Sequence, residues 1–444
     1  MDYIDALLYI NGLAQSEPHG EPDLARRALG PARMARLCSG LGDPQKALRT
    51  VHVAGTKGKG STAAMIHNTL VAGGIKAGLY TSPHLHTLLE RIRLNRRLVS
   101  EEEVAEQAEV VIPAVERLHA EAAELGKVTA FELITALALR LYAEKGVQVA
   151  VLETGMGGRL DATSVADGKV AVITPVSYDH TRLLGHTLAA IAGEKAGIVK
   201  EGAILVSPPQ AAEVVPVLEE ACRARGAQLR LGGRDWHWQE ERSADGRALL
   251  RVDGGPWIYL GPRPALLGRH QLLNGGAAVV ALHALREQGL ALPEEAIAAG
   301  LSSVRWPGRL ETVAKRPAVV LDGAHNEDSA RRLREALGEA FTYGKLILVL
   351  GASADKDIAA IVRELAPLAD KVVVTCSSHQ RAAPVATLVE HCRAVGVEPA
   401  TAADAGAALA LARAEAGPED LICVTGSLYL VAEAREACGL ESVS

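Results

Sequence analysis

A loop rich in glycine and lysine follows an apolar stretch near the start of the chain. It belongs to the sequence VHVAGTKGKGST, residues 51–62. The apolar stretch suits a buried strand, and residues 61–72 carry apolar side chains at helical spacing. In such a strand–loop–helix unit, backbone N–H groups and the positive end of the helix converge on phosphate oxygens. This order predicts a phosphate-binding loop, with Lys59 at the terminal phosphates and Ser61 or Thr62 near a metal ion.

The loop departs from the common phosphate-loop pattern G-x-x-x-x-G-K-[ST]. Val53 stands five residues before Gly58, where the pattern has glycine, and Gly60 follows Lys59 in place of a hydroxyl residue. The alternative interpretation is an ordinary glycine-rich turn between a strand and a helix. The residues that we expect to bind a nucleotide here are Gly55, Thr56, Lys57, Gly58, Lys59, Gly60, Ser61 and Thr62.

Polar side chains follow three further aliphatic stretches. These predicted strands span residues 75–80, 147–152 and 169–175. Ser82 follows the first, Glu153 the second and His180 the third, and ligands of open parallel sheets bind at such carboxyl ends. A carboxylate beside a phosphate loop is where Mg²⁺, which prefers oxygen ligands, is expected. The alternatives are a solvated glutamate, a hydrogen-bonded loop histidine and an unactivated loop serine.

Composition favours an α/β protein and disfavours several other classes. The chain has 444 residues, enough for two or three domains, with 3% aromatic residues and many small aliphatic ones. Its formal net charge is −6 and it has no long basic run, so we expect no nucleic-acid partner. No apolar run of about 18 residues and no basic leader is present, so we expect neither a membrane span nor secretion. Six scattered cysteines without a C-x-x-C pair fit free thiols in the cytoplasm.

A second domain is expected after residues 306–308, where Trp-Pro-Gly interrupts the chain. We therefore place an ATP-binding domain with a mostly parallel sheet at residues 1–305, a hinge at 306–312 and a smaller Rossmann-like α/β domain at 313–444. The predicted strands of the second domain are residues 318–322, 346–350, 372–375 and 421–425. Asp322 ends the first of them, and its alternative role is that of a helix cap.

Two other patterns have a structural interpretation. Thr129 and Glu132 form a capping box that begins a helix, and we favour a cap and core role for Glu132. In residues 230–262, apolar side chains, several of them aromatic, alternate with polar ones, and the pattern breaks at Asp253-Gly254-Gly255, which predicts an antiparallel hairpin.

Several short motifs stand at separate places along the chain. They are G-T-x-G-K-G-S, YTSPHL, ERIRLN, E-x-G-x-G-G-x-x-D, D-H-x-x-x-L-G, E-K-A-G-I, H-Q-x-x-N and D-G-A-H-N. Together they resemble the Mur-ligase superfamily, most closely its branch of folylpolyglutamate and dihydrofolate synthases, from about residue 50 onward. Three positions depart from that pattern. Lys57 and Ser164 stand where the family mostly has asparagine, and Gly275-Gly276 replace small alanines, which we expect to loosen the turn.

The resemblance implies a metal site and a modified lysine in the first domain. Ser82, Glu153 and His180 would hold Mg²⁺, with Asp179 supporting His180. Lys195 resembles the lysine that the family carries as a carbamate, and the alternative is a lysine on a helix surface. The T-x-F-E segment that contains Glu132 resembles one near the family's pterin-binding side, so a substrate contact is the alternative to a cap.

Further roles follow from the resemblance in the later part of the chain. Asn274 would neighbour the adenine and phosphates, with helix capping as the alternative, and Arg309 would contact phosphate. Asp322 and His325 would position the incoming amino acid and help take a proton from its ammonium group. The expected catalytic residues are Lys59, Lys195, Arg309, Asp322 and His325, and Asn274, Arg309 and Asp322 join the nucleotide-binding set.

The implied reaction is the ATP-dependent addition of L-glutamate to a folate through an acyl phosphate, with dihydropteroate as a further acceptor. ATP and Mg²⁺ are the implied cofactors, the partners are small-molecule substrates, and we expect a monomer. One alternative is dihydrofolate synthesis alone. Another is a different Mur-type amino-acid ligase, which we disfavour because the lead of about 50 residues leaves no room for the nucleotide-sugar-binding domain of the cell-wall ligases. A regulatory GTPase would need N-K-x-D and a nicotinamide dehydrogenase G-x-G-x-x-G, and the sequence has neither.

Overall fold

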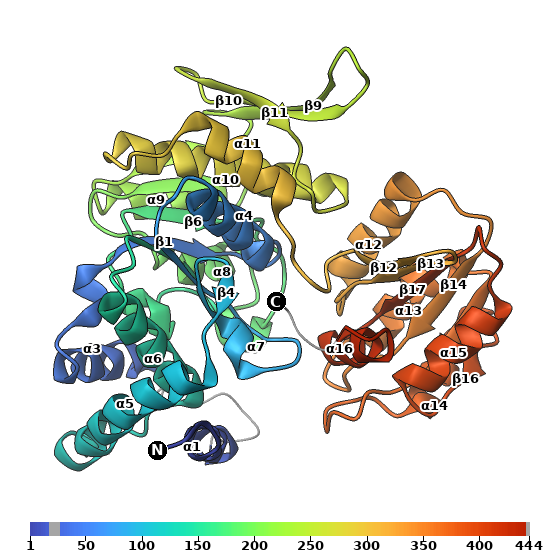
Figure 1. Cartoon of the computed structure of the whole chain (residues 1–444), viewed down its shortest axis with the longest axis horizontal. Helices are drawn as coiled ribbons and strands as arrows, with labels where there is room; N and C mark the ends of the chain where they lie inside the picture. Colours follow the sequence, from blue (N-terminus) through green and yellow to red (C-terminus); the bar gives the residue numbers. More distant parts are fainter. Residues whose placement is uncertain (17–26, 441–444) are drawn as a thin grey trace. The chain divides into compact units, whose positions relative to one another are not determined.

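The computed structural model describes residues 1–16 and 27–440, which divide into two compact units (Figure 1). The first unit contains residues 1–16, 27–84, 88–264 and 272–304. The second contains residues 85–87, 265–271 and 305–440. Each unit is built on one large α/β sheet, so the predicted fold class is confirmed.

The first unit has an eight-stranded sheet in the order β4-β3-β2-β5-β1-β6-β7-β8. The strands are β1 Arg49–Ala54, β2 Ala77–Tyr80, β3 Ile92–Leu94, β4 Arg97–Leu98, β5 Val149–Glu153, β6 Val170–Ile173, β7 Ile204–Ser207 and β8 Gln228–Leu231. Strand β3 is antiparallel to both of its neighbours, β2 and β4. The six consecutive strands β2, β5, β1, β6, β7 and β8 are parallel, so their carboxyl ends share one edge. Almost every residue of β1, β5 and β6 is buried, which explains why these strands are mostly aliphatic in sequence.

Helices cover both faces of this sheet. One face carries α1 Tyr3–Ser16, α3 Gly30–Gly40, α5 Glu101–Glu121, α6 Ala130–Glu144, α8 Leu188–Ala196 and α9 Val215–Arg223. The other helices are α4 Lys59–Ala72, α10 Arg269–Glu287 and α11 Glu294–Ser303. Helix α4 packs closely on α11, because a methyl group at Gly300 would lie 2.3 Å from the Cα atom of Thr69. This packing fixes the helix that begins at the glycine-rich loop.

The predicted hairpin is a three-stranded antiparallel sheet formed by β9 His237–Arg242, β10 Ala248–Asp253 and β11 Ile258–Pro262. It packs on α10 at the glycine pair that we expected to loosen a turn. A methyl group at Gly275 would lie 2.5 Å from Pro264, and one at Gly276 would lie 2.9 Å from the ring of Trp236. The expectation of a loosened turn was wrong: the two glycines sit inside a regular helix and let the hairpin approach it.

The second unit has a six-stranded sheet in the order β12-β13-β17-β14-β15-β16. Its strands are β12 Glu311–Lys315, β13 Ala318–Leu321, β14 Leu346–Leu350, β15 Lys371–Val374, β16 Ala400–Thr401 and β17 Leu421–Thr425. Its helices are α12 Glu327–Ala340, α13 Ile358–Leu365, α14 Val385–Ala394, α15 Ala405–Glu415 and α16 Leu428–Ala437. All neighbouring strands are parallel except β12 and β13. Strand β12 begins at Glu311, inside the predicted hinge, and its half-buried residues lack the aliphatic run that marks the other strands.

No helix in the described part of the chain is long and apolar enough to span a bilayer.

Candidate active site

The glycine-rich loop joins β1 to α4 and is shaped by two glycines with positive φ angles. Gly55 has φ 145°, and a methyl group there would lie 1.8 Å from Thr174 Oγ1. Gly58 has φ 87°, and a methyl group there would lie 2.5 Å from Asn274 Oδ1. Both positions therefore require glycine for conformation and for space. The side chain of Asn274, in the interior of α10, reaches this loop, which excludes the helix-cap alternative.

Helix α4 begins at Lys59, two residues earlier than the sequence pattern indicated, so Lys59, Gly60, Ser61 and Thr62 form its first turn. No side chain caps this end, because Gly58 is the N-cap. The first N–H groups of a helix have no partner within it, and the helix dipole makes this end favourable for anions. The geometry therefore suits a phosphate group.

Backbone and side-chain hydrogen bonds pin the loop to the segment after β6. Thr56 donates its N–H to the carbonyl of Pro175 over 3.1 Å, and its Oγ1 atom exchanges hydrogen bonds with the backbone of Ser177. Lys57 forms an ion pair of 3.1 Å with Asp179. Lys59 Nζ is 3.5 Å from the carbonyl of Thr56. The loop is therefore held in one conformation.

Glu153 and Ser82 meet at the carboxyl edge of the sheet. Glu153 pairs in register with Val53 of β1, and Ser82 follows β2, the other neighbour of β5. The backbone N–H of Ser82 donates to Glu153 Oε2 over 3.2 Å. The side chain of Glu153 is 5% exposed, so the alternative of a solvated boundary glutamate was wrong.

His180 lies at the N-terminus of the short helix α7 Thr181–Leu184. Its backbone has φ 50°, and its side chain is 48% exposed. Asp179 Oδ1 accepts from the His180 backbone N–H over 3.0 Å and lies 3.8 Å from the ring atom Nε2. Asp179 thus contacts both His180 and Lys57, which ties the predicted ligand to the loop. The role of His180 as a metal ligand stays a prediction.

Lys195 is buried in α8, and its ammonium group contacts the loop directly. The side chain donates to the carbonyl of Gly55 over 2.7 Å. The residue is 3% exposed, which excludes the alternative of a lysine on a helix surface. Burial, followed by the positive charge of Lys59, lowers the pKa of Lys195 to about 7. A large fraction of Lys195 is therefore a neutral amine near neutral pH, which is the form that can react with carbon dioxide.

The donor set at this edge suits Mg²⁺ bound together with phosphates. Among residues 1–16 and 27–440, no group of three or more His, Cys, Asp and Glu side chains is arranged so that it could hold a metal ion by itself. Mg²⁺ commonly takes only one or two carboxylates and completes its shell with phosphate oxygens and water. Ser61 and Thr62 are both buried, and Thr62 Oγ1 has no hydrogen-bond partner among the described residues. A buried hydroxyl of this kind calls for an explanation, and a bound ligand would provide one.

In the second unit, Asp322 follows β13 and is buried. Its two carboxylate oxygens accept backbone N–H groups of Leu310 and Ala324, each over 2.9 Å. Burial raises the pKa of Asp322, and Arg309 opposes this rise. The N-cap of α12 is Asn326, so the helix-cap alternative for Asp322 was wrong.

Arg309 and His325 lie close to the same turn. A methyl group at Gly323 would lie 2.6 Å from Arg309 Nη1, so the guanidinium lies over this glycine. His325 Nδ1 is 2.8 Å from the carbonyl of Gly323. The structure thus brings Arg309, Asp322 and His325 together within the second unit.

Two buried networks near the first site were not predicted. Arg33 forms two hydrogen bonds with Glu132, of 2.7 and 2.8 Å, and both side chains are almost fully buried. Glu132 also completes the predicted capping box with Thr129, so its cap and core role is confirmed. The two partners are 99 residues apart, and no local pattern indicates such a pair.

The second network surrounds Asp161, in the loop after Glu153. Asp161 Oδ1 accepts from the Thr163 hydroxyl over 2.6 Å, and Oδ2 accepts from the Met156 N–H over 3.0 Å. Thr163 Oγ1 is also 2.7 Å from His52 Nε2 on β1. Because the Thr163 hydroxyl donates to Asp161, His52 donates to Thr163. The network fixes the loop that follows Glu153.

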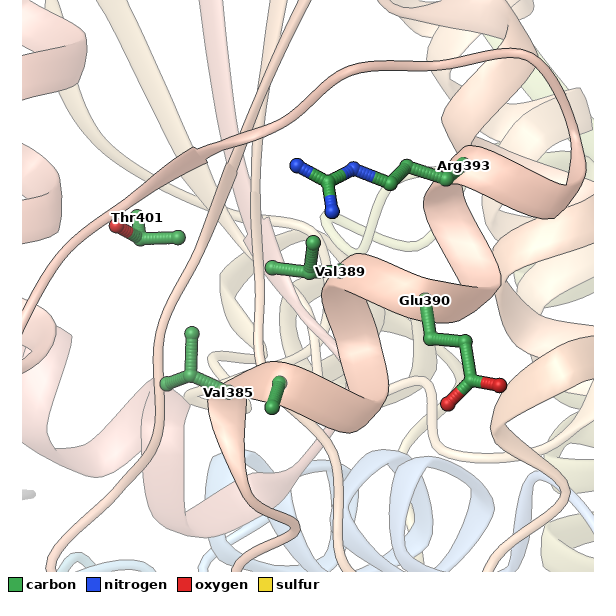
Figure 2. Close-up of a pocket in the computed structure, with 6 residues that line it drawn as sticks. Val385, Val389, Glu390, Arg393 and Thr401 are labelled. Carbon is green, nitrogen blue, oxygen red and sulfur yellow. The ribbon is translucent and has the colours of Figure 1, made fainter.

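The second unit also has a pocket of about 530 Å³ between α14 and the edge strand β16 (Figure 2). It is lined by Val385, Ala386, Val389, Glu390, Arg393 and Thr401. None of these residues belongs to the predicted site. Arg393 already pairs with Glu398 over 2.6 Å.

Comparison with known families gives two matches. Residues 53–282 match the Mur ligase middle domain, and residues 308–428 match the Mur ligase glutamate ligase domain. The chain is 32% identical over 423 residues to dihydrofolate synthase/folylpolyglutamate synthase of Bacillus subtilis, covering 92% of this chain and 94% of that protein. It is 40% identical over 425 residues to a probable bifunctional folylpolyglutamate synthase/dihydropteroate synthase of Haloferax volcanii. That match covers 91% of this chain but only 48% of the relative, so the chain spans about half the length of this relative.

Solved structures agree with these matches over nearly the full length. Folylpolyglutamate synthase of Mycobacterium tuberculosis, complexed with ADP, is 32% identical and superposes with a TM-score of 0.87, covering 99% of each chain. A bifunctional folylpolyglutamate synthase/dihydrofolate synthase with Mn, AMPPNP and L-glutamate bound is 30% identical. Its TM-score is 0.84, and the match covers 99% of this chain and 98% of that one. The chain therefore belongs to the Mur ligase family and, within it, to the folylpolyglutamate and dihydrofolate synthases.

Proposed function

We propose that this chain is an ATP-dependent ligase that adds L-glutamate to a folate, and that it also joins L-glutamate to dihydropteroate. The observation that supports this most is the contact of Lys195 with the loop carbonyl of Gly55, beside the strand that ends at Glu153. In a chain of this family, a lysine with a lowered pKa that contacts the predicted phosphate loop, beside a buried carboxylate, supports the proposal.

The chemistry explains why ATP is needed. A carboxylate is a poor electrophile and does not condense with an amine in water. Attack of the substrate carboxylate on the γ-phosphorus of ATP gives an acyl phosphate and ADP. The amine of L-glutamate then attacks the acyl carbon and expels phosphate. The protein contributes positioning and neutralisation of charge.

In the first unit, the α4 N-terminus and Lys59 would bind and orient the phosphates. Ser82, Glu153 and His180 would hold Mg²⁺, which neutralises phosphate charge when it is bound. In the second unit, Asp322 and His325 would bind the ammonium group of the amino acid, and Arg309 would contact phosphate. We assign ATP to the first unit and the amino acid to the second.

Two finer assignments belong to the same proposal. All six cysteines are unpaired, which is consistent with a cytoplasmic enzyme. We also propose that the enzyme is a monomer with small-molecule substrates only. Light scattering of the purified protein measures its mass and would reveal any larger assembly.

The decisive assay measures ADP release with tetrahydrofolate or dihydropteroate, each with and without L-glutamate. We expect glutamate-dependent release with both acceptors. Release with dihydropteroate alone would restrict the enzyme to dihydrofolate synthesis, and release with neither would refute the proposal. Lys59→Ala and Glu153→Ala should abolish activity, whereas Lys76→Met, at an exposed position of the same unit, should retain it.

A further inference from the structure

An arginine is held over an aromatic ring at the carboxyl edge of the second sheet. Arg381 lies in the loop after β15, and its Nη2 atom donates to the hydroxyl of Tyr429 over 2.5 Å. Its guanidinium carbon is 5.6 Å from the centre of that ring. His379 stacks on the same ring, with 3.7 Å between ring centres and 13° between planes. Tyr429 therefore orients the guanidinium group of Arg381.

The loop that carries Arg381 is braced on two sides. The carbonyl of Arg381 accepts from the N–H of Ala354, in the loop after β14, over 2.8 Å. On the other side, Ser378 donates both its N–H and its hydroxyl to Glu433 Oε1, over 2.7 and 2.8 Å. The arginine is thus fixed in backbone as well as in side chain.

The charge of Arg381 has no carboxylate partner within the described residues, since no ion pair there includes it. The acid that its charge influences is Asp355, which forms an ion pair of 3.1 Å with Lys356. Arg381 is also exposed. A fixed, exposed guanidinium presents two parallel N–H groups that match the geometry of a carboxylate.

The position of Tyr429 connects this arginine to the turn that holds Asp322. Tyr429 lies in the first turn of α16, after β17, and β17 is the neighbour of β13. Gly426, at the end of β17, donates its N–H to the carbonyl of Ala324 over 3.0 Å. Arg381 therefore reaches back from β15 toward the strand next to the one that delivers Asp322.

We propose that Arg381 binds the side-chain carboxylate of the incoming L-glutamate, with Tyr429 as its positioning residue. The inference rests on the proposed function, in which Asp322 and His325 hold the ammonium group. The α-carboxylate is one carbon from that ammonium group, whereas the side-chain carboxylate lies further along the molecule. The Arg381 guanidinium is hydrogen-bonded to Tyr429, which follows β17, the strand next to the one that delivers Asp322, and this placement suits the more distant carboxylate.

The first test is kinetic. Arg381→Gln should raise the KM for L-glutamate about 10- to 100-fold, the range expected for lost hydrogen bonds to a charged group. The KM values for ATP and folate should stay unchanged. The preference for L-glutamate over L-glutamine should fall by a similar factor, because the neutral amide of L-glutamine gains little from the charge of Arg381. General damage to the fold would not change this ratio selectively.

Further variants separate charge from shape. Arg381→Lys keeps the charge without the planar fork and should lie between the wild type and Arg381→Gln. Tyr429→Phe removes only the hydroxyl acceptor and should raise the KM for L-glutamate by less than Arg381→Gln. The matched control is Arg393→Gln, which removes an exposed arginine of the same unit that is paired with Glu398, and it should change nothing. Thermal melts of all four variants identify any that fail to fold.

Direct binding of L-glutamate to the full-length protein, measured by calorimetry, separates this inference from the proposed function. Turnover with an unchanged KM and unchanged preference in both Arg381→Gln and Arg381→Lys would overturn the inference and leave the ligase standing. Binding that is lost in Arg381→Gln, in a protein that releases no ADP, would support the inference and overturn the ligase. Absence of both binding and turnover in the wild type would overturn both.

Discussion

The buried Lys195 makes the stability of the first unit depend on pH in a direction that can be worked out. Its pKa falls from 10.5 to about 7 in the folded protein, first because of burial and then because of Lys59. Between these two values the unfolded chain holds a proton that the folded chain lacks, so the free energy of unfolding rises with pH. The slope is about 1.4 kcal/mol per pH unit. Over the whole interval the contribution is on the order of 5 kcal/mol, present at alkaline pH and lost as pH falls to about 7.

Substitution of Lys195→Met removes this titration, and the comparison with the wild type isolates it. We expect the wild type to gain about 1.4 kcal/mol per pH unit relative to Lys195→Met between pH 7 and 10. Urea unfolding followed by tryptophan fluorescence reports chiefly on the first unit, where Trp236, Trp238 and Trp257 lie. The buffers should be free of carbonate, because a carbamate on Lys195 would replace the titrating amine.

The matched control is Lys76→Met, which removes an exposed lysine of the same unit. Its unfolding free energy should follow the wild-type pH profile. Parallel profiles for the wild type and Lys195→Met would show that Lys195 titrates as an ordinary lysine. That result would refute the argument that burial beside Lys59 prepares a neutral amine.

Two further perturbations test the packing around the site. Gly58→Ala and Gly74→Ala both force a side chain into a positive φ angle, of 87° and 75°, and each should lower the free energy of unfolding by about 1–2 kcal/mol. Only Gly58→Ala displaces Asn274, since nothing lies within 4 Å of a methyl group at Gly74, so only Gly58→Ala should weaken ATP binding in calorimetry. Equal ATP affinity in the two variants would contradict the proposed role of Asn274 beside the loop. Glu132→Ala leaves Arg33 buried without its carboxylate and should cost about 3–5 kcal/mol in urea unfolding, whereas the double variant Arg33→Met/Glu132→Leu should cost less. If the double variant is as unstable as Glu132→Ala, the lost stability comes from lost packing and not from an unpaired buried charge.

Sequence reasoning could place the candidate residues of the first unit at one edge because they follow strands of a parallel sheet. Buried parallel strands are continuous aliphatic runs, so their ends can be found in the sequence, and their carboxyl ends share one edge. The register that pairs Val53 with Glu153, and the contact of Ser82 with Glu153, follow from that rule. Strand β12 was missed within the predicted hinge because only one side of this edge strand is paired and its residues are half-buried.

Contacts between distant segments could not be predicted in the same way. Arg33 and Glu132 are charged residue types that are usually exposed, and only the packing of α3 on α6 shows that they are buried together. The contact of Asn274 with Gly58 likewise depends on how α10 lies beside the loop. For Asn274, the family resemblance indicated a role near the nucleotide, while the residues alone also allowed a helix cap.

The pairing of charges decides which of the three lysines at the loop is available to a phosphate. Lys57, the departure from the family pattern, is held by Asp179 in an ion pair of 3.1 Å, so its extra charge is largely offset. Lys195 is buried and has a pKa of about 7, so much of it carries no charge near neutral pH. Lys59 belongs to no ion pair among the described residues, and its one hydrogen bond there, to Thr56, is long at 3.5 Å. The sequence supplies three lysines of the same kind, and folding makes them unequal: Lys57 is paired with Asp179, and Lys195 is buried. Lys59, at the start of α4, is therefore the lysine that we propose for the terminal phosphates.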